Sequence, residues 1–91
     1  MSELGTAVRP RIGPGFRLQW EPAQECHVLL YPEGMVKLNP SAGEIMKRCD
    51  GNASVADIVA DLEKAFSTTG LERDVLGFMD IAAKQRWLTW E

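Results

Sequence analysis

Residues 27–51 constrain the fold of this chain more than any other stretch of its sequence. Residues 28–31 form a short run that is apolar at every position, which is typical of a central strand buried on both faces. Residues 32–34, Pro-Glu-Gly, predict a tight hairpin turn, because proline presets the first turn position and glycine tolerates a positive φ. Residues 35–38 are then expected to return antiparallel to the first strand.

The same stretch ends in a helix with a clear beginning and end. Asn39 is a candidate N-cap and Pro40 suits the first helical position. A capping box from Ser41 to Glu44 is an alternative beginning two residues later. Residues 50–51, Asp-Gly, indicate the end of the helix. Its apolar residues recur at helical spacing: Ala42, Ile45, Met46 and Cys49.

One more strand and two more helices are predicted on either side of this stretch. Residues 16–20 alternate between apolar and polar side chains, which indicates a half-buried strand. A second helix begins after its cap, Ser54, and a third spans about residues 72–86. The residues expected to face the core are Phe16, Leu18 and Trp20 in the strand, Val55, Ile58, Val59, Leu62 and Phe66 in the second helix, Val75, Phe78, Met79 and Ala82 in the third, and Trp87, Leu88 and Trp90 after it.

The order β-β-β-α-α-α predicts a small α+β domain, with a three-stranded antiparallel sheet followed by three α-helices in a winged-helix-like arrangement. Short links between the strands favour a meander, which leaves the third strand at an edge. Residues 16–91 are expected to form this single domain. Residues 1–15 are rich in Gly and Pro and predict a flexible or extended N-terminal arm, not a packed element. An exchanged arm would give a homodimer, so monomer and homodimer both remain open.

Composition and charge narrow the function classes. The chain has 91 residues, 45% hydrophobic and 25% charged, as in an ordinary soluble domain. No apolar run approaches the ~20 residues that a membrane span needs, and the N-terminus lacks the features of a signal peptide, so we expect a cytoplasmic protein without a membrane partner. Residues 54–91 carry seven acids and four bases. This acidic balance disfavours binding to nucleic acid phosphates.

The sequence contains no recognisable catalytic constellation. His27 is the only histidine, so one chain cannot assemble a histidine pair or triad. Cys26 and Cys49 lack a supporting base and the paired spacings of a zinc site, and two reduced thiols are favoured over one disulfide. We therefore expect no enzyme, no metal and no cofactor. The edge strand is the candidate binding surface, where Lys37 either guards against unwanted pairing or contacts a ligand.

The chain resembles the PqqD family over roughly residues 8–91. The resemblance is carried by residues 27–51, by Asp74-Val75 and by the terminal Arg86-Trp87-Leu88. Residues 29–34, 38–39 and 50–51 make it specific in combination. Members of this family are small accessory proteins of pyrroloquinoline quinone (PQQ) biosynthesis in bacteria.

The resemblance implies a non-catalytic peptide chaperone. Such proteins bind the precursor peptide PqqA and present it to the radical-SAM enzyme PqqE, which cross-links a Glu and a Tyr in the peptide. The family is also the prototype of the recognition elements that bind leader peptides in other peptide-modification (RiPP) pathways. These domains receive the peptide as an extra strand on their third strand, beside the last helix. On this chain the implied peptide-binding residues are Met35, Val36, Lys37, Leu38, Arg73, Val75 and Phe78.

Two alternatives remain from the residues themselves. The number and order of the elements also suit a winged-helix nucleic-acid-binding protein, although Asp74 and Asp80 would then point a recognition helix with negative charge at phosphates. An oxidising or hydrolytic enzyme of the same pathway is the less favoured alternative, because no cofactor motif is present.

Overall fold

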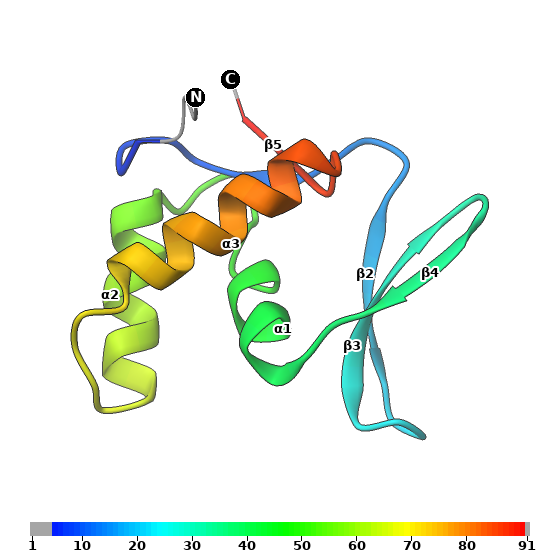
Figure 1. Cartoon of the computed structure of the whole chain (residues 1–91), viewed down its shortest axis with the longest axis horizontal. Helices are drawn as coiled ribbons and strands as arrows, with labels where there is room; N and C mark the ends of the chain where they lie inside the picture. Colours follow the sequence, from blue (N-terminus) through cyan, green and yellow to red (C-terminus); the bar gives the residue numbers. More distant parts are fainter. Residues whose placement is uncertain (1–4, 91) are drawn as a thin grey trace.

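A computed structural model describes residues 5–90 and confirms the α+β class (Figure 1). The three-stranded sheet lies at one end of the molecule and the helices pack beside it (Figure 1). No helix within residues 5–90 is long and apolar enough to cross a membrane. The elements are β1 (Arg11–Ile12), β2 (Arg17–Glu21), β3 (Cys26–Tyr31), β4 (Gly34–Lys37), α1 (Pro40–Met46), α2 (Val55–Ala65), α3 (Glu72–Lys84) and β5 (Leu88–Thr89).

The sheet is an antiparallel meander with β3 in the centre, as predicted. Its inner face carries Leu18, Leu29 and Val36, which lie opposite one another in the register and pack against the core. Val28 points to the other face because successive side chains of a strand alternate. Its side chain is buried outside the main core cluster, between its cross-strand neighbours Gln19 and Lys37.

Helix α1 lies directly on the sheet. The Asn39 side chain accepts a hydrogen bond of 2.8 Å from the Ala42 amide, so Asn39 is the N-cap and Pro40 begins the helix. Gly43 faces the His27 ring so closely that an added Cβ would lie 2.8 Å from Nδ1. Glycine at this position therefore lets α1 approach β3.

The core is formed where the helices meet the inner face of the sheet. Helix α2 begins with a complete capping box, in which Ser54 and Asp57 each accept a hydrogen bond from the other's backbone amide. All apolar residues predicted to recur along α1 are buried. The buried cluster comprises Leu29, Leu38, Ala42, Ile45, Met46, Cys49, Val55, Ile58, Val59, Leu62, Val75, Met79, Ala82 and Leu88.

The N-terminal residues 5–13, which we call the N-terminal strap, begin with a turn at residues 6–7 and are packed against the domain. The carbonyls of Thr6 and Val8 accept hydrogen bonds of 3.0 and 2.8 Å from the Ala56 and Val55 amides at the beginning of α2. Amides in the first turn of a helix have no partner within the helix, so the strap supplies acceptors that α2 lacks.

The second half of the strap joins the two ends of the chain. β1 pairs antiparallel with β5, and the Gly13 amide donates to the Trp87 carbonyl at 2.8 Å. The Pro10 carbonyl accepts a hydrogen bond of 2.9 Å from the Gly51 amide. Within residues 5–13 the structure thus differs from the unpacked arm expected from the Gly and Pro content, while residues 1–4 of that arm lie outside the described part of the chain.

Two expected core residues and two helix ends need correction. Helix α1 ends at Met46, before the expected end at residues 50–51, because the Arg48 and Cys49 amides bond three residues back, to Ile45 and Met46, in tighter turns. Trp20 is 51% exposed, because it lies near the end of β2 and makes a T-shaped contact with the His27 ring instead of packing into the core. Phe66 is 54% exposed, because it is the C-cap of α2 and the chain turns away at Ser67 with a φ of 51°. Helix α3 ends at Lys84, before Arg86, which has a φ of 67°.

Candidate functional site

Strand β4 is an edge strand whose outer side is open. Within residues 5–90 it pairs with β3 alone. The Leu38 amide donates to the His27 carbonyl at 3.0 Å, which makes these two residues a hydrogen-bonded pair. Such pairs alternate along an antiparallel ladder with pairs whose backbone groups point away from the partner. From the register, Val36 also bonds to β3, while the N–H and C=O groups of Met35 and Lys37 point to the open edge.

The predicted site residues of this edge lie at two depths. Met35 is 48% exposed and Lys37 is exposed, both on the outer face of the sheet. Val36 is half-buried against the core, and the Leu38 side chain is buried within it. The open edge is therefore supported from beneath by apolar side chains and presents its free backbone groups to solvent.

The predicted residues of α3 are also distributed between the surface and the core. Arg73 is exposed, Phe78 is half-buried, and Val75 is buried. Phe78 and Val36 pack against the same core cluster, which places β4 and α3 around one apolar centre. The structure thus anchors Val36 and Phe78 on one core cluster, and it leaves Arg73 on the surface of α3.

A groove lies between the beginning of α1, the end of α2 and the beginning of α3. It has a volume of about 360 Å³. Sequence reasoning had not identified this groove, and of the predicted site residues only Val75 lines it. The other lining residues are Pro40, Ser41, Glu44, Ile45, Leu62, Phe66, Thr68, Leu71 and Asp74.

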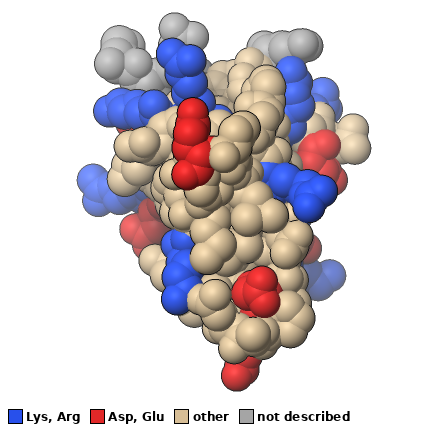
Figure 2. Space-filling model, turned by 90° about the vertical axis from the view of Figure 1, so that its right-hand side faces the viewer, with Lys and Arg blue, Asp and Glu red and all other residues tan. Residues whose placement is uncertain are grey.

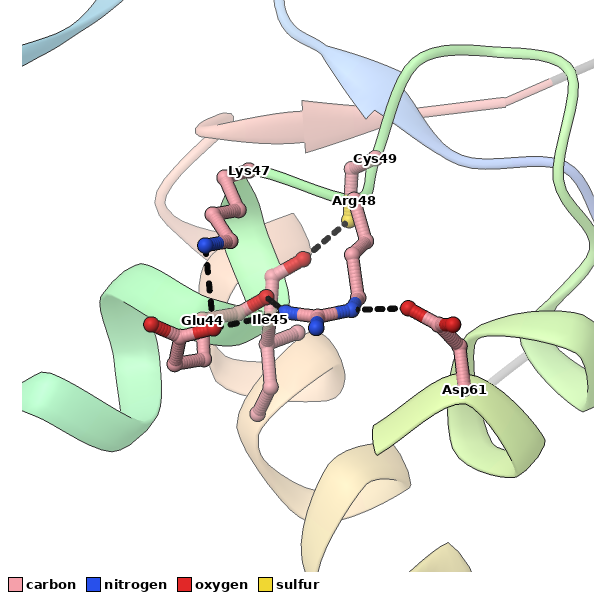
Figure 3. Close-up of polar contacts among 6 residues, drawn as sticks. All are labelled: Glu44, Ile45, Lys47, Arg48, Cys49 and Asp61. Carbon is pink, nitrogen blue, oxygen red and sulfur yellow. Dashed lines mark hydrogen bonds and ion pairs between the residues drawn. The ribbon is translucent and has the colours of Figure 1, made fainter. Parts of the chain in front are cut away.

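The α1 wall of the groove is held by a polar cluster around Glu44 (Figure 3). Arg48 Nη1 lies 2.8 Å from Glu44 Oε1 and 2.8 Å from the Glu44 carbonyl, and Nε binds the Asp61 carboxylate on α2. Lys47 Nζ lies 3.2 Å from the same Glu44 oxygen. The hydrogen bond from Arg48 holds the pKa of Glu44 below its ordinary value. Glu44 is therefore ionised at neutral pH, and Arg48 ties α1 to α2 behind the groove.

The His, Cys and charged side chains of the described residues are dispersed. No group of three or more His, Cys, Asp or Glu within residues 5–90 is arranged to hold a metal ion. Cys26 and Cys49 are free thiols. At the sheet end of the molecule, charged side chains are scattered between broad uncharged areas (Figure 2).

The fold and the open edge define a small winged-helix-like recognition domain. A solved structure of this type is similar to the chain over 94% of both chains, with a TM-score of 0.78 and 29% identity. It is the solution structure of the PqqD truncation of Methylobacterium extorquens PqqCD, described as a functional and stand-alone RiPP recognition element. The family model for coenzyme PQQ synthesis protein D (PqqD) matches residues 26–88, and the chain belongs to this family.

Curated relatives agree with this assignment. A protein of Azotobacter vinelandii named PqqA binding protein is 53% identical over 89 residues, which cover 97% of each chain. A protein of Pseudomonas aeruginosa with the same name is 56% identical over 80 residues, which cover 87% of each chain. Both relatives thus match this chain along nearly their whole length.

Proposed function

We propose that this protein is a non-catalytic peptide chaperone of PQQ biosynthesis that binds the precursor peptide PqqA and presents it to PqqE. The binding of PqqA is supported by the names of the curated relatives, which match the chain over most of its length. The single structural observation that carries the mode of binding is the open edge of β4. There, Met35 and Lys37 direct unused backbone donors and acceptors to solvent.

In this proposal the peptide adds as a fourth strand beside β4. Backbone hydrogen bonds to Met35 and Lys37 supply affinity, and side chains of the peptide reach apolar surface at the half-buried Val36 and Phe78. Arg73, which is exposed on α3, would meet a polar or acidic group of the peptide. Leu38 and Val75 are buried beneath the surface, so their role is to keep β4 and α3 in place.

Two substitutions at Lys37 distinguish the contribution of its backbone N–H to PqqA binding from that of its side chain. Lys37→Pro removes the outward N–H but leaves the bonds between β3 and β4 intact, since proline is tolerated on the open side of an edge strand. We expect it to weaken PqqA binding about fivefold, because one lost hydrogen bond contributes roughly 1 kcal/mol and tenfold corresponds to about 1.4 kcal/mol. Lys37→Ala keeps the N–H and should change the affinity by less than about threefold, the value of one exposed charge.

Calorimetric titration with PqqA gives both affinities, and circular dichroism verifies that each variant is folded. Normal PqqA binding by folded Lys37→Pro would show that the peptide does not add to β4. Presentation to PqqE is tested separately, by the rate of Glu–Tyr cross-linking with and without this protein. A rate unchanged by the protein would contradict presentation while leaving peptide binding intact.

A further inference from the structure

We propose that the groove between α1, α2 and α3 is a second subsite for the same peptide, which takes an apolar side chain next to a Lys or Arg. This inference rests on the proposed function, because the occupant is a further segment of the peptide that adds to β4. The groove shares one residue, Val75, with the strand-addition site inferred above.

The lining of the groove favours an apolar side chain. Six of its residues are apolar: Pro40, Ile45, Leu62, Phe66, Leu71 and Val75. Phe66 is 54% exposed at its rim, although large apolar residues are usually buried. An exposed aromatic ring beside an apolar hollow is typical of a surface that binds a partner.

The charge of the groove favours a basic neighbour. Its only charged lining residues are Glu44 and Asp74. Glu44 forms ion pairs with Lys47 and Arg48, but Asp74 forms no ion pair within residues 5–90. Asp74 is exposed and therefore accessible to a cation of the peptide.

The position of the groove in the chain connects it with β4. Strand β4 ends at Lys37, and Pro40 and Ser41 already line the groove. The intervening residues are the buried Leu38 and the N-cap Asn39, so little chain separates the edge from the groove. A peptide that extends past the Lys37 end of β4 therefore comes close to the beginning of α1, where the groove lies.

The apolar contact is tested by Phe66→Ala, with Ile81→Ala as its matched control. Both residues are large, apolar and more than half exposed, but Phe66 lines the groove and Ile81 does not. We expect Phe66→Ala to weaken PqqA binding at least about fivefold, the loss of a modest aromatic anchor, and Ile81→Ala to leave it within about twofold. Calorimetric titration of the full chain with PqqA measures both.

The charge is tested by Asp74→Asn, with Glu72→Gln as its matched control. Both acids lie in the first turn of α3 and offset the positive end of the helix dipole, but only Asp74 lines the groove. We expect Asp74→Asn to weaken PqqA binding about two- to fivefold at low salt, less at high salt, and Glu72→Gln to have little effect.

Amide shifts locate the peptide and separate the two proposals. PqqA should shift the amides of Met35 and Lys37 and also those of Phe66, Thr68 and Leu71. Shifts at β4 alone, with Phe66→Ala and Asp74→Asn equal to their controls, would overturn the second subsite while the proposed function stands. An absence of binding to the unsubstituted protein would overturn both.

Discussion

Cys49 shows how its surroundings decide the chemistry of a single residue. Its thiol is 4% exposed, and it donates a hydrogen bond of 3.3 Å to the Ile45 carbonyl. Burial, with a smaller contribution from the charge of Asp50, raises the pKa of the thiol to about 12 from its ordinary value of 9.0. A thiol with such a pKa stays protonated at neutral pH and is a poor nucleophile.

The raised pKa of Cys49 predicts a loss of stability in alkali. The unfolded chain releases this proton near pH 9 and the folded protein only near pH 12, so the stabilisation is complete below pH 9 and is lost as pH rises towards 12. We expect the free energy of unfolding to fall by up to about 1.4 kcal/mol per pH unit in this window. Urea unfolding of the unsubstituted protein and of Cys49→Ala, which cannot titrate, isolates this contribution. A difference between the two that is constant from pH 8 to pH 11 would contradict it.

At the scale of elements, local sequence patterns predicted what forms. Asn39 and Ser54 are N-caps as expected, and the expected apolar spacing of α1 is buried. The structure adds how much a substitution at each position would change the stability, because this depends on neighbours that are distant in sequence. Two helical glycines illustrate this: an added Cβ would meet nothing within 4 Å at Gly77, but would press on His27 at Gly43.

Substitution of these two glycines by alanine should therefore have opposite effects. Alanine loses less backbone freedom on folding than glycine, so Gly77→Ala is expected to stabilise the protein by about 0.5–1 kcal/mol. Gly43→Ala has the same advantage in helix propensity, but its Cβ forces α1 away from β3. We expect it to lower the free energy of unfolding by about 1–3 kcal/mol in total. Thermal and urea unfolding of both variants measure the two effects. Equal effects at the two positions would refute the close approach of α1 to His27.

At the scale of the whole molecule, the N-terminal strap closes the fold. It contacts the beginning of α2, the segment after α1, and the C-terminal strand β5. Pro10, within it, is fully buried. Packing of the strap against its own domain satisfies the backbone groups that an exchange between two subunits would otherwise use.

Stepwise truncation should separate the two halves of the strap. Removal of residues 1–9 deletes the carbonyl acceptors of Thr6 and Val8, and water can replace them, so we expect a loss of about 1–2 kcal/mol. Removal of residues 1–13 also deletes the buried Pro10 and the pairing of β1 with β5, with an expected total loss of at least about 3 kcal/mol. Urea unfolding compares the two chains with the full one. Truncation of residues 1–13 without loss of stability would show that the strap is dispensable for folding.

The sequence by itself determined six of the eight elements described, their order and the edge position of β4, because turns, caps and hydrophobic periods depend on residues close together in the chain. It did not predict β1 and β5, because each is only two residues long and forms by pairing with the other end of the chain. It also contained the family resemblance that the comparisons confirmed. The identity of the residues implied as the site at Met35–Leu38 and on α3 came from that resemblance and stays a prediction.

Only the tertiary structure decided which backbone groups of β4 are free, where the groove lies and how the strap packs. The register of β4 on β3 directs the backbone of Met35 and Lys37 outward, and a shift by one residue would reverse this. The groove combines segments around residues 40–45, 62–68 and 71–75. The carbonyls of Thr6, Val8 and Pro10 in the strap accept hydrogen bonds from amides more than 40 residues away. Such contacts have no local signature, because they arise from packing between distant parts of the chain. The sequence alone therefore predicted a flexible or extended arm in place of the packed strap, and it did not reveal the groove.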